Sequence, residues 1–246
     1  MQANTFEMTL EDAYMISTHV KNFSFKIEQP VVFNYQSGQF ITIYFDLDAQ
    51  AYHRSYSIAN SPNTSGRIEF AASYVKNGPG SEFLFHQLKP GDSVQARGPF
   101  GRLLLQQSAP RRYVFIATST GITPFRAMMP MLMQQLSDNA SSHAVLLHGV
   151  KTCGDTLYYP EFMRWRDKEA QFSYRVYFSQ EQQPIDPAQA QYHGHVQDAF
   201  PSLNFEPNHD IVYLCGNPNM VDNAFTLLKN QGFASSAIIR EKYISR

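Results

Sequence analysis

The pattern of apolar residues changes near residue 110, and this change limits the possible folds more than any other feature of the sequence. Over the first hundred residues, short apolar runs alternate with turns rich in Gly, Pro, Asn and Asp. Such spacing is typical of a small antiparallel sandwich or barrel. Further along, near-continuous apolar runs indicate strands that are buried on both faces, as in a parallel sheet. These runs occupy residues 113–118, 144–150, 174–178 and 211–216.

Helices are expected between the buried strands. Apolar residues recur at the helical spacing i, i+3, i+4 and i+7 in two sets, which are Phe125, Met128, Met129 and Leu132, and then Val221, Ala224, Phe225 and Leu228. The pairs Thr123-Pro124 and Asn217-Pro218 have the pattern of an N-cap followed by proline, so both helices are predicted to begin directly after a strand. Pro130 is expected to kink the first helix or to end it near Met129.

The length and the two patterns together predict two domains. A chain of 246 residues, of which 43% are hydrophobic, fits two domains of ordinary size. We predict an antiparallel β-barrel domain over residues 1–107, with one helix at 81–88, followed by an α/β domain with a parallel sheet over residues 108–246.

Composition and charge exclude several kinds of function. The formal net charge of −1 gives no indication of binding to nucleic acid or to a membrane, and the N-terminus lacks a secretory signal pattern, so the cytoplasm is expected. The two cysteines, Cys153 and Cys215, cannot supply the ligands of a typical iron–sulfur cluster. His193 and His195 have no evident third ligand, so no metal site is predicted. Any redox chemistry would then come from a dissociable organic cofactor.

Two segments that follow buried strands have the pattern of a ligand-binding turn. The sequence ATSTGITP at 117–124 passes from a strand through small residues to a helix start, and CGNPNM at 215–220 does the same. Helix N-termini bind phosphates, and ligands of open parallel sheets bind beyond the carboxyl ends of the strands. The first segment, taken alone, is equally well explained as a tight strand–helix turn. Cys215, taken alone, is better explained as a buried core thiol than as a group beside a reacting ring.

Two further motifs lie in the first domain. The sequence RSYS places Arg54 and Tyr56 on one face of a strand and its two serines on the other. An arginine suits a pyrophosphate and a tyrosine suits a flat ring, although periodicity alone favours an ordinary half-exposed strand. Ser81, which follows the sequence GPG, is expected to cap the helix at 81–88. This helix start is either a phosphate-binding site or simply the end of a capped loop.

Taken together, these segments resemble the ferredoxin–NADP reductase superfamily of flavoproteins, in the correct order and over nearly the whole chain. The matching segments are Arg54-Ser55-Tyr56-Ser57, Tyr74-Val75-Lys76, Gly80-Ser81, Gly98-Pro99-Phe100-Gly101, Ser119-Thr120-Gly121-Ile122-Thr123-Pro124 and Cys215-Gly216-Asn217-Pro218. Ser119 departs from the family pattern, which has glycine at that place.

The resemblance implies an FAD site in the first domain. The residues that it assigns to FAD are Arg54, Ser55, Tyr56, Ser57, Tyr74, Val75, Lys76, Gly80 and Ser81. Arg54 would contact the pyrophosphate, and Gly80 and Ser81 would add donors to it. Tyr56 would pack on the isoalloxazine. Ser57 would lie near N5, the flavin atom that accepts hydride.

The resemblance also implies a nicotinamide dinucleotide site in the second domain. The residues that it assigns there are Thr118, Thr120, Gly121, Lys151, Ser179, Gln180, Gly216 and Asn217. Cys215 would lie beside the nicotinamide. Tyr243, near the C-terminus, would cover the flavin until the nicotinamide displaces it, with Glu241 close by. Ser57, Cys215 and Glu241 are the predicted catalytic residues. Three residues follow Tyr243, which is a departure from the family ending.

The sequence favours NADP(H) over NAD(H) only narrowly. Lys151 and Ser179 would hold a 2′-phosphate, but Gln180 stands where members that bind NADP often have arginine, which clamps phosphate better. Glu181 would repel the phosphate if its side chain pointed inward. NAD(H) therefore stays open.

The resemblance implies an FAD-dependent reductase that transfers electrons between NADP(H) and a small acceptor protein such as ferredoxin or flavodoxin. Two enzymatic alternatives remain, an NADH-linked oxygenase reductase component that lacks its own iron–sulfur cluster and a free-flavin reductase. Retention of Arg54, Gly80 and Ser81 favours bound FAD over free flavin. A flavin-binding interaction protein without turnover is the alternative from another class, and the presence of Ser57, Cys215 and Glu241 gives no sign of it.

Overall fold

Two separate six-stranded sheets organise the chain. The computed structural model describes residues 4–27, 33–106 and 110–243. One unit comprises Met1–Leu105 and Thr123–Met129, and the other comprises Gln106–Ile122 and Pro130–Arg246. The domain boundary expected between residues 107 and 108 falls at 107–109, outside the described residues.

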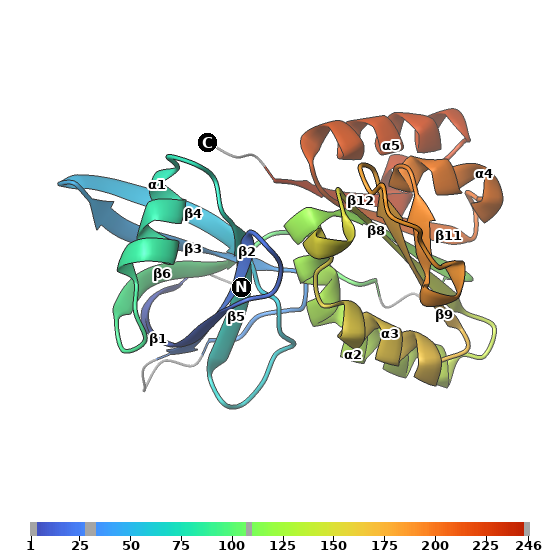
Figure 1. Cartoon of the computed structure of the whole chain (residues 1–246). Coiled ribbons are helices and arrows are strands. Elements are labelled where there is room, and N and C mark those ends of the chain that lie inside the picture. The colour runs from blue at the N-terminus through green and yellow to red at the C-terminus, as the bar shows by residue number, and fades with distance from the viewer. Residues whose placement is uncertain (1–3, 28–32, 107–109, 244–246) are drawn as a thin grey trace. The chain divides into compact units, whose positions relative to one another are not determined.

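The first unit is built on an antiparallel sheet (Figure 1). Its strands are β1 (Asn4–Met15), β2 (Val20–Ile27), β3 (Phe40–Leu47), β4 (Gln50–Ser57), β5 (Arg67–Ser73) and β6 (Ser93–Phe100), in the order β4-β3-β6-β1-β2-β5. The sheet curls into a half-barrel. Its two edge strands approach each other, because the Ala59 N–H just after β4 donates to the Glu69 carbonyl of β5 at 2.7 Å. The predicted antiparallel β architecture is confirmed.

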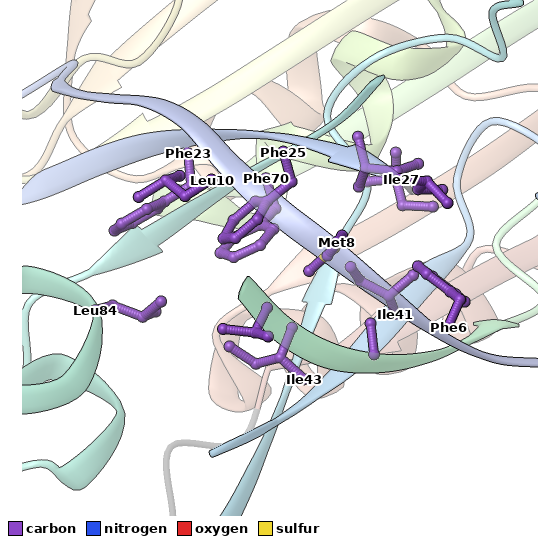
Figure 2. Packing of buried hydrophobic residues seen from close by; sticks show 14 of the residues in the cluster. Phe6, Met8, Leu10, Phe23, Phe25, Ile27, Ile41, Ile43, Phe70 and Leu84 are labelled. Atoms are coloured by element: carbon purple, nitrogen blue, oxygen red, sulfur yellow. The ribbon is translucent and has the colours of Figure 1, made fainter. Parts of the chain in front are cut away.

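Aromatic rings form the centre of this unit, and Phe70 is the ring that connects the others (Figure 2). Its centroid lies 5.4 Å from the rings of both Phe23 and Phe25 and 4.5 Å from that of Tyr56, and all three pairs are stacked. Phe23, Phe25 and Phe70 are fully buried. Each buried aromatic side chain removes a large apolar area from water, so this cluster is a main source of the unit's stability.

The helix predicted at 81–88 begins two residues earlier. It consists of α1 (Pro79–Glu82) and a π-helical turn, η1 (Phe83–Gln87), with Gly78 as the N-cap. Proline at the first helical position fixes a helical φ, so the helix starts there. The expectation that Ser81 caps the helix is wrong, because its Oγ accepts a hydrogen bond from the Val75 N–H at 2.7 Å instead.

The second unit is built on a parallel sheet (Figure 1). Its strands are β7 (Arg112–Thr118), β8 (His143–Val150), β9 (Phe172–Phe178), β10 (Gln191–His193), β11 (Asp210–Gly216) and β12 (Ile238–Lys242), in the order β10-β9-β8-β7-β11-β12. All four apolar runs of the sequence are strands, as predicted. The sequence did not indicate β10 or β12. The strand order reverses at β7, which pairs with β8 on one side and β11 on the other. Such a switch point is where ligands of open sheets bind.

An ion pair joins the amino ends of β7 and β11. The Arg112 guanidinium binds the buried Asp210 carboxylate through two nitrogens, at 3.1 and 2.5 Å, and Arg112 also donates to the Leu203 carbonyl at 2.7 Å. A two-pronged arginine–carboxylate contact fixes geometry as well as adding energy. It holds the register of the two strands at the end opposite to their turns.

Helices connect the strands. They are α2 (Thr123–Asp138), α3 (Tyr159–Lys168), α4 (Phe200–Leu203) and α5 (Pro218–Asn230), with 3₁₀ turns η2 (Ser119–Ile122), η3 (Cys153–Asp155), η4 (Pro187–Gln189), η5 (Val196–Ala199) and η6 (Ser235–Ala237). Asn217 caps α5 as predicted, since its side chain accepts the Asn219 N–H at 2.9 Å. Thr123 does not cap α2. The N-cap is Ile122, because η2 already brings the chain into helical geometry before Thr123.

Pro130 does not end α2, which continues to Asp138. Proline removes one backbone hydrogen bond, but Met129, Leu132 and Leu136 on both sides of it are almost fully buried, and their burial favours continuation of the helix. Among the described residues, no helix is long and apolar enough to cross a membrane.

Replacing Phe70 with alanine is expected to lower the free energy of unfolding of the first unit by about 3–5 kcal/mol, because it leaves a cavity against three aromatic rings. Chemical denaturation at a fixed excess of FAD measures this change. Met15→Ala is the control, since Met15 is 49% exposed, and it is expected to change the free energy by less than about 0.5 kcal/mol. A loss below about 1 kcal/mol for Phe70→Ala would contradict the central place of this ring.

Candidate functional site

In the first unit, β4 presents Arg54 and Tyr56 on the same half-buried face, and α1 brings Gly80 against both side chains. A Cβ at Gly80 would lie 3.2 Å from Arg54 Cγ and 3.4 Å from the Tyr56 hydroxyl. Only hydrogen fits there without displacement. Backbone, guanidinium and phenol thus meet at one place, although they come from segments about 25 residues apart in the sequence. The predicted sharing of a face by Arg54 and Tyr56 is confirmed.

The ring of Tyr56 is anchored to the core. One face stacks on Phe70, with an interplanar angle of 12°. Burial raises the pKa of Tyr56, and the nearby Arg54 charge opposes this only partly, so the phenol stays neutral at physiological pH. A planar ligand on Tyr56 would therefore use the other face of a ring that is already held in place.

The neighbouring serines have different environments. Ser57 is 5% exposed and ends β4, whereas Ser55 is exposed and its Oγ lies 2.9 Å from Thr42 Oγ1 on β3. Ser57 is thus positioned by a buried strand end, as a residue that meets a reacting atom would need to be.

The segment 74–76 connects to α1 through Ser81. The Val75 N–H donates to Ser81 Oγ, and the Gly78 N–H donates to the Val75 carbonyl at 2.9 Å. The Tyr74 ring is 40% exposed and meets the Phe85 ring edge-on at 5.4 Å. The side chains of Val75 and Lys76 are exposed. The structure therefore brings the predicted FAD residues of this segment to α1, with the backbone of Val75 fixed.

In the second unit, the turns after β7 and β11 are packed backbone to backbone. A Cβ at Gly121 would collide with the Cys215 carbonyl oxygen, and one at Gly216 would collide with Thr118 Oγ1. The Asn217 N–H donates to Thr118 Oγ1 at 2.9 Å. The two predicted dinucleotide turns thus form one edge of the sheet, at its topological switch point, and each needs its glycine.

Strand β12 brings the C-terminal residues to the same edge. In the parallel pairing of β11 with β12, Cys215 lies opposite Glu241, and the Tyr243 N–H donates to the Gly216 carbonyl at 2.8 Å. The structure therefore places Glu241 beside Cys215, and the backbone of Tyr243 beside Gly216. Residues 244–246, which follow Tyr243, lie outside the described residues.

Cys215 is a buried neutral thiol. Its side chain is 0% exposed, and burial raises the pKa of Cys215 well above its usual value, with the Glu241 charge adding to the effect. A thiol that stays protonated is a poor nucleophile. Its contribution at this edge is therefore shape and a polarizable surface rather than covalent chemistry.

The loops after β8 and β9 are tied together beside Lys151. The Gln180 N–H donates to the Lys151 carbonyl at 2.8 Å, and the Ser179 N–H donates to the Val150 carbonyl at 3.0 Å. These hydrogen bonds bring the backbones of Lys151, Ser179 and Gln180 close together, and the three residues are exposed.

Glu181 also belongs to this pair of loops. Its carboxylate accepts backbone N–H groups of Cys153 at 2.9 Å, Gln182 at 2.9 Å and Gln183 at 3.0 Å. These hydrogen bonds, that of Cys153 first, lower the pKa of Glu181. The carboxylate is thus a fixed anion that is already bound by its own backbone.

Two histidines have structural partners that the sequence did not indicate. His195 caps η5 in a reciprocal arrangement with Asp198, whose carboxylate accepts the His195 N–H at 2.7 Å. His148 is fully buried in β8 and lies 3.1 Å from the Ser119 carbonyl. A histidine inside an otherwise apolar strand is the signal that could have identified it. In the described part of the chain, no three His, Cys, Asp or Glu side chains are placed to hold a metal ion.

The geometry fits the two cofactors. A glycine where an added Cβ would crowd the Arg54 and Tyr56 side chains is suited to the close approach of a pyrophosphate and a flat ring. Glycine-lined turns that lead into helices at a switch point are suited to a dinucleotide.

Comparison with known proteins decides the family. Residues 7–104 match the oxidoreductase FAD-binding domain, and residues 115–225 match the oxidoreductase NAD-binding domain. Over 230 residues the chain is 30% identical to ferredoxin–NADP reductase B of Sorangium cellulosum (strain So ce56), covering 90% of each chain. This chain belongs to the ferredoxin–NADP reductase superfamily. It is an oxidoreductase with an FAD-binding and an NAD(P)-binding domain.

Other members of the superfamily show its breadth. The chain is 26% identical to the phenol 2-monooxygenase reductase component DmpP of Pseudomonas sp. (strain CF600), covering 93% of this chain but 62% of that longer protein. The crystal structure of a ferredoxin NADP+ reductase from Neisseria gonorrhoeae with bound FAD and NADP has the same fold, with a TM-score of 0.83, 19% identity and coverage of 98% and 99% of the two chains.

Gly121→Ala is expected to weaken NADP(H) binding by about tenfold or more, because the added methyl group must displace the Cys215 backbone, and overpacking of this kind costs about 1–3 kcal/mol. Titration of the dinucleotide against the flavin absorbance measures the Kd. The bound FAD content should stay as in the wild type. Ser141→Ala, in an exposed turn at the amino end of β8, is the control. An unchanged Kd for Gly121→Ala would contradict the role of this close approach.

The two cysteines are expected to differ in reactivity. Iodoacetamide should modify the exposed Cys153 of the native protein and spare Cys215, which is buried and whose raised pKa keeps it protonated. Peptide mass spectrometry after brief treatment at pH 8 checks this, with denatured protein as the control in which both react. Native labelling of Cys215 as fast as that of Cys153 would contradict the buried, neutral thiol.

Proposed function

We propose that this chain is an FAD-dependent reductase that transfers electrons between NADP(H) and a small acceptor protein, a ferredoxin or a flavodoxin. The observation that carries the proposal is the assembly of Arg54, Tyr56 and Gly80 in one unit, together with the paired turns at Gly121 and Gly216 in the other. Bound FAD supplies the conversion of one two-electron hydride transfer into single-electron transfers. The cytoplasm is part of the proposal, since reduced dinucleotides are metabolites of the cell interior.

In the proposed FAD domain, residues 1–107, Arg54 holds the pyrophosphate through its guanidinium. Gly80 allows the phosphate to approach the backbone of α1, whose neighbour Ser81 is fixed by Val75. Tyr56 packs on the isoalloxazine with the face that Phe70 leaves uncovered. The buried Ser57 lies near the N5 atom and orients it.

The remaining FAD residues have supporting roles in this proposal. The strand residue Ser55 and the segment Tyr74-Val75-Lys76 line the cofactor. Tyr74 and Lys76 are exposed, so they are available to a ligand without a change of fold. Ser55 is oriented by its contact with Thr42.

In the proposed NAD(P) domain, residues 108–246, the turn at Thr118, Thr120 and Gly121 holds the pyrophosphate. The turn at Gly216 and Asn217 accommodates the nicotinamide half. The neutral Cys215 thiol provides an uncharged, polarizable surface for the nicotinamide ring. The Glu241 carboxylate is paired in register with it.

Tyr243 covers the flavin in the proposed resting enzyme.

Lys151, Ser179 and Gln180 contact the adenosine 2′-phosphate in this proposal. Lys151 supplies the positive charge there. The Glu181 carboxylate repels a nearby phosphate less than a free carboxylate would, because it already accepts hydrogen bonds from three backbone N–H groups. These observations favour NADP(H) over NAD(H).

An oxygenase reductase component is the second candidate, because several similar proteins carry such names. This chain spans about three fifths of the length of those proteins. The choice of acceptor distinguishes the two candidates.

Anaerobic stopped-flow measurements of the purified holoenzyme with NADPH and, separately, NADH test the proposal. Loss of the oxidised flavin absorbance is expected to be faster with NADPH. Lys151→Ala should lower kcat/KM for NADPH by about fivefold and leave NADH nearly unchanged, since an exposed ion pair contributes up to about 1 kcal/mol. Ser57→Ala should slow flavin reduction by either donor.

The outcomes separate the candidates. Faster bleaching with NADH would move the enzyme to the NADH-linked branch, and absence of bound flavin would overturn the central claim. Reoxidation of the reduced enzyme by a ferredoxin or flavodoxin, but not by free FMN, would support the proposed acceptor. Unchanged flavin reduction in Ser57→Ala would show that Ser57 has no part in hydride transfer.

A further inference from the structure

His148 lies in the middle of β8, at a position where a polar ring is costly. It is 0% exposed, and it is paired with Ala117 of β7 on one side and Val176 of β9 on the other. A buried polar group destabilises a protein unless it is hydrogen-bonded. The buried imidazole of His148 therefore requires hydrogen-bond partners.

Both ring nitrogens have partners, and the partners fix the tautomer. His148 Nε2 lies 3.1 Å from the Ser119 carbonyl oxygen, and Nδ1 lies 3.4 Å from the Tyr174 hydroxyl. A carbonyl oxygen can only accept a hydrogen bond, so Nε2 must carry the proton. Nδ1 is then an acceptor for the Tyr174 hydroxyl, which is itself buried.

Ser119 adopts a backbone conformation that serine avoids. Its φ is +49°, in the left-handed region that favours glycine. The chain turns there from β7 into η2, and Thr120 and Gly121 follow at once. A conformation of this kind persists only where the surroundings impose it.

The Ser119 carbonyl and the Thr120 N–H belong to the same planar peptide unit. In a trans peptide these two groups point in opposite directions. A hydrogen bond that draws the carbonyl toward the buried imidazole therefore directs the Thr120 N–H away from His148. The direction of the Thr120 N–H is thus set by His148, which lies in the neighbouring strand β8.

We propose that His148 is a positioning residue for the dinucleotide: its Nε2–H anchors the Ser119 carbonyl and so presents the Thr120 N–H to the pyrophosphate. This inference rests on the proposed role of the turn in dinucleotide binding. Burial lowers the pKa of His148 to about 4, and the hydrogen bond to Ser119 opposes that shift only partly. The ring is therefore neutral at physiological pH, with a single hydrogen-bonding pattern.

A pair of substitutions tests the hydrogen bond separately from the volume of the side chain. His148→Gln keeps an N–H donor at about the reach of Nε2, and His148→Leu removes it. The Kd of NADP+ for the holoenzyme, titrated by the change in flavin absorbance, is expected to rise by about tenfold in His148→Leu and by less than about threefold in His148→Gln. KM for NADPH should rise with the Kd, while kcat at saturation changes less.

Val176→Ala is the matched control. It removes buried side-chain volume beside His148 without touching Ser119. It should lower the melting temperature and leave the Kd unchanged. A rise in Kd in Val176→Ala equal to that in His148→Leu would overturn the proposal, because loss of packing alone would then explain the effect.

Ser119→Gly provides a rescue experiment. Glycine adopts a positive φ without steric cost, so a turn with glycine at 119 depends less on the anchor. Adding Ser119→Gly to His148→Leu is expected to recover part of the lost affinity. If the affinities of His148→Leu and His148→Gln both equal that of the wild type, the anchor has no functional role.

Nuclear magnetic resonance of the wild-type protein labelled with ¹⁵N-histidine detects the hydrogen bond from His148 to Ser119 directly. This measurement does not depend on the folding of His148→Leu. A slowly exchanging Nε2–H signal of His148 at neutral pH is expected, and its absence would overturn the assigned hydrogen bond. In uniformly ¹⁵N-labelled protein, addition of NADP+ should shift the Thr120 and Gly121 amide signals. A present Nε2–H signal without such shifts would overturn the dinucleotide role of the turn, and with it the purpose assigned to His148.

Discussion

The close approach of the backbone after β7 to the backbone after β11 is the constraint on which the ligand edge of the second unit depends. Gly121 leaves no room for a side chain against Cys215, and Gly216 leaves none against Thr118. At the other end of the same strands, Arg112 and Asp210 fix the register. The two turns are thus held as one surface, and β12 adds Glu241 and Tyr243 to it through backbone pairing.

Much of this architecture could be predicted because it depends on local patterns. A strand buried on both faces must be apolar along its whole length, and Asn217 caps α5 through contacts within three residues. The period of two along β4 placed Arg54 and Tyr56 on one face. The contact of Gly80 with both of them depends on how α1 folds back onto the strand, and no local pattern contains that information.

The errors of prediction arise where a local preference is overridden, either by a nearby residue in the sequence or by tertiary packing. Ser81 and Thr123 are good capping residues, but Pro79 and the turn η2 begin their helices earlier. Pro130 is a helix breaker, but burial on both sides of it maintains α2. Strand β12 contains only two apolar residues in its five and is held by its neighbour β11 rather than by its own composition.

The buried imidazole of His148 makes the folding stability of the parallel-sheet unit sensitive to acid. In the unfolded chain this ring takes up a proton near pH 6.5, as an ordinary histidine does, whereas in the folded protein it does so only near pH 4. The folded state therefore binds fewer protons in this interval. Its advantage is complete above pH 6.5 and diminishes as the pH falls toward 4. Acid is thus expected to weaken the parallel-sheet unit at the same residue that is proposed to anchor the turn after β7.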